Sequence, residues 1–117
     1  MSLEAADATT DDLGASTGAD LDINYAAEVG KAHIISGVMW GFYGPPAAGS
    51  VIEVYDGDGT DVAQVFFRLP INADGPGYPI RFDPHKRGTI GNAMVIRVTN
   101  GGGGAAEVNA LGHYTQG

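Results

Sequence analysis

A run of carboxylates at residues 56–61 is the first place where this sequence could do chemistry. Asp56, Asp58 and Asp61 stand close together with two glycines between them, as oxygen ligands do in calcium-binding loops. The EF-hand pattern, however, requires glycine at its sixth position and glutamate at its twelfth, where this chain has Asp61 and Phe67. An Asp-Gly pair between two β-rich stretches instead predicts the turn of a β-hairpin. We therefore expect a hairpin here and no dedicated metal site.

The histidines His33, His85 and His113 lack the spacing of a helical metal site, and the chain has no cysteine to complete one. His33 and His113 fall in two expected strands, on faces that could be outward, and they become neighbours if those strands pair. No Gly-x-Ser-x-Gly motif is present, and no Lys-Ser or Lys-Thr follows the glycines at 101–104 as a phosphate loop requires. The sequence thus predicts no catalytic residue, no cofactor and no metal, and favours a protein that is not an enzyme.

Positive charge gathers at residues 81–88, where Arg81, His85, Lys86 and Arg87 occur in a chain of formal net charge −8. A short charge run of this kind is usually a solvated loop. The sharper alternative is a contact for an acidic partner, such as the N-terminal segment of a neighbouring copy. The negative charge of the whole chain repels DNA, so we expect no nucleic-acid partner.

Alternating apolar and polar residues, broken by glycine and proline, predict short strands at 21–25, 32–43, 51–55, 62–69, 78–82, 92–98 and 105–114. Residues 83–91 are expected to form a connection, and no helical period of useful length is present. Short strands with a turn about every ten residues indicate an all-β fold, a single β-sandwich of jelly-roll type.

The phase of the alternation separates an expected core from an expected outer face. The expected core residues are Ile34, Val38, Trp40, Phe42, Ile52, Val54, Val65, Phe67, Ile80, Phe82, Met94, Ile96 and Val108. Apolar residues on the opposite faces favour burial between subunits, and Gly37 and Gly41 leave shallow places where another backbone or subunit could approach. We expect a homo-oligomer, a trimer, built through the sandwich face. The interface candidates are Ile35, Met39, Val95, Leu111, His85, Lys86 and Arg87.

The N-terminal segment has an unusual composition. Residues 1–30 contain seven carboxylates and no lysine or arginine, and residues 1–19 have few large apolar side chains. Such a segment cannot bury enough surface to fold alone. The expected organisation is an extended acidic arm at 1–19, lying against another subunit, and a β-sandwich domain at 20–117. No secretory signal or apolar run of membrane-spanning length is present, which predicts a protein made in the cytoplasm, or the mature form of a processed one, without a membrane partner.

Five segments follow one another in a recognisable order: 30–33 opening a strand, 51–57, 80–82, 88–94 and, after a glycine-rich turn, 108–114. In this order, over about residues 25–114, the chain resembles small β-sandwich proteins encoded among the virion genes of tailed bacteriophages. The resemblance implies a structural protein of the virion, assembled in the host cytoplasm. The leading expectation is a head decoration (cement) protein that clamps neighbouring subunits, with the major capsid protein or other virion proteins as partners.

Three alternatives remain open. A tail or neck component would differ only in the symmetry of its assembly. A carbohydrate-binding jelly roll would use aromatic side chains such as Tyr43 and Tyr114 to stack on sugars, although Trp40 shares its strand face with expected core residues. A small cupin-like enzyme would require a cluster of histidine and carboxylate ligands that the spacing does not predict.

Overall fold

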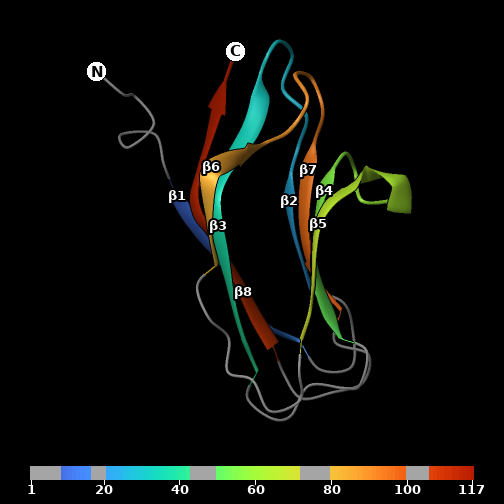
Figure 1. Ribbon diagram of the computed structural model, residues 1–117, viewed down its shortest axis with the longest axis vertical. Helices are drawn as coiled ribbons and strands as arrows, with labels where there is room; N and C mark the ends of the chain where they lie inside the picture. The colour runs from blue at the N-terminus through green and yellow to red at the C-terminus, as the bar shows by residue number, and fades with distance from the viewer. Residues whose placement is uncertain (1–8, 17–20, 43–49, 72–79, 100–105) are drawn as a thin grey trace.

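The computed structural model describes residues 9–16, 21–42, 50–71, 80–99 and 106–117. In these residues the chain forms eight strands in two antiparallel sheets that pack face to face as a sandwich (Figure 1). The elements are β1 (Thr9–Ser16), β2 (Leu21–Tyr25), β3 (Ala32–Phe42), β4 (Val51–Asp56), the 3-10 turn η1 (Val62–Gln64), β5 (Val65–Pro70), β6 (Ile80–Arg87), β7 (Met94–Val98) and β8 (Ala106–Gln116). No helix in this part of the chain has the length and apolar character needed to cross a membrane.

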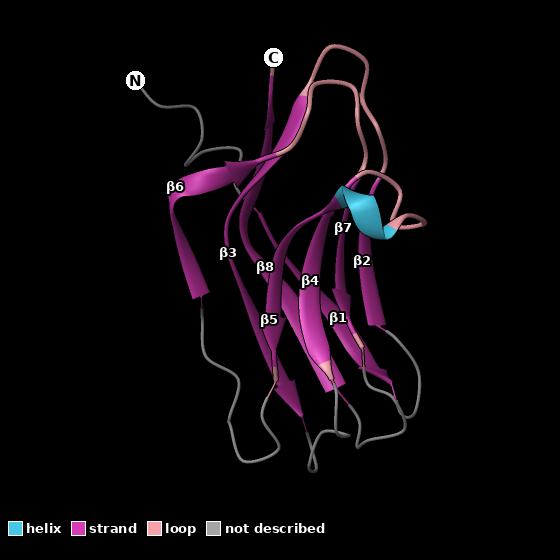
Figure 2. Ribbon diagram, turned by 45° about the vertical axis from the view of Figure 1, so that its right-hand side comes forward, coloured by secondary structure: helices cyan, strands magenta, loops and turns pink. Residues whose placement is uncertain are grey.

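The two sheets have the strand orders β1-β8-β3-β6 and β2-β7-β4-β5. β1 and β2 lie in contact at one edge of the sandwich. β6 and β5 are the outer strands at the other edge, where β6 is sharply bent (Figure 2). The all-β sandwich that the alternation predicted is confirmed.

The expected strands agree closely with β2–β5, β7 and β8, and they differ from the structure in two places. The residues 62–64 form η1, and β5 begins only at Val65. β6 continues to Arg87 through residues expected to be a connection, because Lys86 and Arg87 pair with Ile35 and Ile34 of β3.

Residues 9–16 were expected to be part of an arm on another subunit, but they form β1 and pair with β8 of the same chain. The register places Asp12 opposite Asn109 and Leu13 opposite Val108. The stretch has no clear apolar alternation, so its strand character comes from a partner far along the chain rather than from its own pattern. β1 therefore belongs to the sandwich.

The core lies between the two sheets. Its members are Ile23, Ile35, Val38, Trp40, Ile52, Val54, Ile71, Phe82, Met94, Ile96, Val98, Val108 and Ala110. Of the other residues expected there, Phe67 and Ile80 pack against this cluster from its margin, Val65 is half-buried, and the side chain of Phe42 lies outside the described residues.

The alternation along β3 breaks between Ile35 and Val38, which both face the core. Opposite this point β6 advances from residue 81 to 86 while β3 advances only from 35 to 37, so β6 bulges away from the sheet. Gly37 permits the close approach, because a Cβ there would lie 2.3 Å from the carbonyl oxygen of Ile80.

This break in phase reverses two expectations. Ile35, expected at an interface, is fully buried in the core, whereas Ile34, expected in the core, is buried outside the core cluster. Ile34 lines a surface depression together with Tyr114 and His85. The approach of another backbone at Gly37 is confirmed, with β6 of the same chain as the neighbour, whereas a Cβ at Gly41 would meet nothing within 4 Å.

Replacement of Ile35 by alanine tests the phase break. We expect Ile35→Ala to lower the free energy of unfolding by about 2–5 kcal/mol, since it opens a cavity in the core. Met39→Ala, on the same strand but half-buried, should cost clearly less. Urea unfolding of both variants provides the measurement, and equal costs would place Ile35 outside the core.

Deletion of residues 1–16 tests the position of β1. Because the deletion removes the partner of β8 and bares its edge, we expect a lower melting temperature and a greater tendency to self-associate. Deletion of residues 1–8 leaves β1 intact and is the matched control. Thermal unfolding curves that coincide for the two deletions would show that β1 adds nothing to the sandwich.

Candidate functional site

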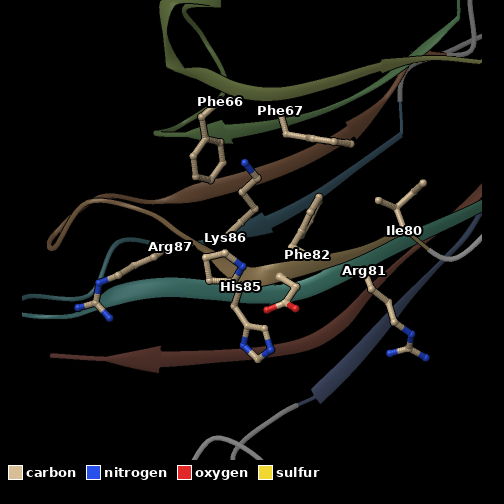
Figure 3. Close-up of a pocket in the computed structure, with 10 residues that line it drawn as sticks. Phe66, Phe67, Ile80, Arg81, Phe82, His85, Lys86 and Arg87 are labelled. Carbon is tan, nitrogen blue, oxygen red and sulfur yellow. The ribbon is translucent and has the colours of Figure 1, made fainter.

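The strongest candidate for a binding site is a groove of about 580 Å³ between the edge strands β5 and β6. β5 supplies Phe66 and Phe67, and β6 supplies Ile80 and Phe82 (Figure 3). Because the two strands end their respective sheets, each has one neighbouring strand within the described residues. The groove is therefore the open side of the sandwich.

The floor of the groove is aromatic, and one cation lies against its rings. Phe66 and Phe67 extend from β5 toward Phe82 and Lys86, which extend from β6 (Figure 3). The rings of Phe67 and Phe82 meet edge to face, with centroids 4.9 Å apart. The Lys86 ammonium lies 5.9 Å from the centroid of Phe66 and 5.7 Å from that of Phe82, within the range of a cation–π contact. Both Phe66 and Phe67 are only half-buried, so part of this apolar surface remains exposed to solvent.

Two arginines and a histidine lie along the other side of β6. Arg81, His85 and Arg87 point away from the phenylalanines (Figure 3). Nδ1 of His85 lies 2.8 Å from the hydroxyl of Tyr114, and Arg87 donates to Oε1 of Gln116 at 2.9 Å. Within the described part of the chain, Arg81, Lys86 and Arg87 form no ion pair. The groove also contains one carboxylate, Asp83, so its charge is positive.

Arg68 and Arg97, in contrast to the arginines of the groove, form ion pairs within the described chain. On the outer face of the second sheet, Asp22, Arg97, Glu53 and Arg68 stand opposite one another across β2, β7, β4 and β5. Nε of Arg97 lies 2.8 Å from Asp22, and Arg68 binds the buried Glu53, with its Nε at 2.7 Å. The Tyr55 hydroxyl donates to Glu53 at 3.1 Å and accepts from Arg97 at 3.2 Å. We call these four residues the charge row, and within it each arginine is paired with a carboxylate.

The electrostatics of the charge row agree with that geometry. The hydrogen bonds that Arg97 donates to the Asp22 carboxylate raise the pKa of Arg97 above its ordinary range, which keeps the guanidinium charged. Burial, together with the nearby Glu53 carboxylate, raises the pKa of Tyr55. The arginines of the row therefore stabilise the sheet, whereas the cations of the groove are available to a partner.

The bulge in β6 shapes the groove. Residues 82–85 lie between the two stretches of β6 that pair with β3, and Phe82, Asp83, Pro84 and His85 all line the groove. Pro84 has no N–H to donate, so this part of the edge cannot continue a sheet ladder. The bulge therefore disfavours the addition of a further strand at this edge.

The expected interface residues do not form one surface. His85, Lys86 and Arg87 lie together at the groove, on a strand rather than on the expected loop. Ile35 belongs to the core, as described above. Val95 is only 2% exposed, so its assignment to an interface is also wrong.

Val95 is covered by the connection between β4 and β5. Gly59, with a φ of +82°, passes so close that a Cβ there would lie 3.2 Å from Cγ2 of Val95. Met39 and Leu111, in β3 and β8, are half-buried, and their role in an interface stays a prediction.

The connection between β4 and β5 explains the carboxylates at 56–61. Asp56 accepts from the backbone N–H of Thr89 at 2.9 Å, and Asp61 accepts from that of Ala63 at 2.9 Å. The hydroxyl of Thr60 donates to Asp58 at 2.6 Å, and this bond lowers the pKa of the Asp58 carboxyl. The three side chains hold the loop, and β4 and β5 form the expected hairpin.

His33 and His113 become neighbours through the pairing of β3 with β8, as expected. Nδ1 of His33 lies 2.9 Å from Nε2 of His113, and Nε2 of His33 donates to the carbonyl of Ala26 at 2.7 Å. The ring of Tyr25, from the opposite sheet, stacks on His113 with centroids 3.6 Å apart. His33 is only 3% exposed, so the pair connects the two sheets inside the sandwich. No group of three or more potential metal ligands is found among the described residues.

Sequence reasoning identified the cations of this site but not its aromatic floor. Phe82 was expected in the core and lies there, and Phe67 packs against its margin, but nothing in the order of the residues shows that these rings also meet at the open edge. Phe66 and Phe67 both pack against the core cluster because the register shift between β4 and β5 falls at residue 66, and the local alternation has no signal for such a shift.

Comparison with known proteins gives no assignment for this site. No family model matches the sequence, and no curated protein matches it either.

The two kinds of arginine provide a direct test. Arg97→Gln should lower the free energy of unfolding by about 1–3 kcal/mol, because it leaves the partly buried Asp22 and Tyr55 without their partner. Arg81→Gln, which removes an exposed cation of the groove, should change it by less than about 0.5 kcal/mol. Chemical denaturation separates the two effects, and a large cost for Arg81→Gln would assign the groove cations to the fold.

Proposed function

We propose that this chain is a non-enzymatic structural protein of a phage particle, a head decoration (cement) protein that clamps neighbouring capsid subunits. The observation that carries the proposal is the open groove between β5 and β6, with an aromatic floor and cations that no carboxylate of the described chain neutralises. A resident partner with apolar and acidic side chains would complete such a surface.

We further infer that the sandwich is a jelly roll. Its two four-stranded sheets have the orders β1-β8-β3-β6 and β2-β7-β4-β5. In this order β8 lies between β1 and β3, and β7 lies between β2 and β4. Jelly rolls of eight strands occur in viral capsid proteins and in lectins. This architecture supports a virion protein and equally a carbohydrate-binding module, so the choice between them rests on the groove.

The clamping mechanism follows from the chemistry of the groove. Partner side chains that cover the half-buried Phe66 and Phe67 would gain the free energy of apolar burial. Arg81 and Lys86 would guide an acidic segment to the groove and fix its orientation, because complementary charges contribute mainly to encounter rate and specificity. An interface of about 1,200–2,000 Å² is typical for a stable contact of this kind. We propose that the protein acts as a trimer and binds the major capsid protein or other virion proteins.

The alternatives have less support. A tail or neck component would use the same groove in another symmetry. A carbohydrate-binding module needs exposed ring faces, but Trp40 and Tyr114 are each only 6% exposed. Tyr43, the other residue considered for sugar stacking, lies outside the described residues.

Purified particles of the phage that encodes the chain provide the test. We expect mass spectrometry to find the protein in them at a fixed ratio to the major capsid protein, and cryo-electron microscopy to place it on the head. Purified protein should rebind particles from which it has been stripped, more weakly at high salt, because exposed charges are then screened. Absence from the particles, or specific binding to a glycan array, would contradict the proposal.

A further inference from the structure

The cations that form no ion pair within the described residues gather at one edge of the sandwich, and the acidic N-terminal segment joins the fold at the opposite edge. Of its six basic side chains, Arg81, Lys86 and Arg87 lie at the groove, and Arg68 and Arg97 belong to the charge row. β1, into which the acidic N-terminal segment leads, is the outer strand of the same sheet at the far edge from β6. Two copies that turn the same edge toward each other therefore do not bring the groove of one copy to β1 of the other.

From this division we propose that the groove of one copy binds residues 1–8 of a second copy. The inference rests on the proposed clamping function and names the partner of its groove. Residues 1–8 contain Glu4 and Asp7 beside the apolar Met1 and Leu3 and have no lysine or arginine. This combination complements a groove with an aromatic floor and uncompensated cations.

The geometry favours a second copy over the same chain. In one sandwich β1 and β6 are separated by β8 and β3, a distance of about 14 Å at the usual strand spacing. A segment from the same chain would have to cross the outer face of both strands and pass around β6. An eight-residue segment spans up to about 27 Å, enough to reach from β1 of one copy into the groove of a copy placed beside that edge.

A contact between the β1 edge of one copy and the β5/β6 edge of the next is heterologous, since it joins two different surfaces. Contacts of this type close into rings when the rotation between copies allows it. In a cyclic trimer, each groove would receive the N-terminal segment of one neighbouring copy. The same division of charge disfavours a twofold dimer through the grooves, because it would bring Arg81 and Lys86 of both copies together.

Charge reversal on the full chain tests the proposal. Wild-type protein should sediment as an oligomer at micromolar concentration and 50 mM salt, and dissociate at 500 mM salt. The groove variant Arg81→Glu/Lys86→Glu and the segment variant Glu4→Lys/Asp7→Lys should each weaken association at least about tenfold. The variant with all four changes should associate again, since it restores the opposite charges.

Lys31→Glu is the matched control, because it changes an exposed cation outside the groove and should leave association unchanged. Circular dichroism and melting curves verify that each variant folds. If the Arg81→Glu/Lys86→Glu variant does not fold, the Arg81→Glu variant replaces it in the experiment. A wild-type protein that is monomeric under these conditions, or association that neither reversal weakens, would overturn the inference.

Particle binding by the same variants separates this inference from the proposed function. If neither charge reversal weakens association yet the protein binds stripped particles, the groove serves the capsid without joining copies, and the inference fails while the proposed function stands. If the wild-type oligomer responds to charge reversal as expected but the protein is absent from particles, the inference stands and the proposed function fails.

Discussion

The mismatch in length between β6 and β3 is the constraint on which much of this structure depends. Between the pairs Ile35–Lys86 and Gly37–Arg81, β6 contains more residues than β3 can match. Of the surplus residues, Phe82 reaches into the core, whereas Asp83, Pro84 and His85 are exposed at the open edge. Gly37 makes this possible because it lets the carbonyl of Ile80 come closer than any Cβ would allow.

The same mismatch connects the core to the surface. On β3 it shifts the phase of the side chains, so that Ile35 and Val38 both point inward. On β6 it places Phe82 toward the phenylalanines of β5 and Arg81 on the other side. The groove is thus a consequence of how the core packs.

The fold could be predicted from the sequence wherever one strand face is uniformly apolar. β4 and β7 were predicted because Ile52, Val54 and Ile96 alternate with polar residues and carry the main apolar surface. β1 was missed because its pattern is weak and its partner, β8, lies at the other end of the chain. Ile35 and Val95 were misplaced because a bulge and a covering loop decide their burial, and neither has a signal in the local alternation.

The candidate site was predictable only in part, for a similar reason. His85, Lys86 and Arg87 are close in sequence, so their grouping needed no knowledge of the fold. The floor joins Phe66 to Phe82 across two different sheets, and that contact depends on the topology. Charge pairing is also a property of three dimensions: the sequence gives no means of telling Arg97, which is held by Asp22, from Arg81, which is not.

The order of strands also determines when this protein can fold. β7 and β8 are the last strands to be synthesised, yet β7 lies between β2 and β4, and β8 lies between β1 and β3. Neither sheet can close until its late strand, β7 or β8, has left the ribosome, and contacts between such distant segments form slowly. The earlier strands meanwhile present unpaired edges to one another and to other chains. A nascent chain that stops before Ala106 lacks the strand that joins β1 to β3, so the C-terminal residues determine whether the sandwich forms at all.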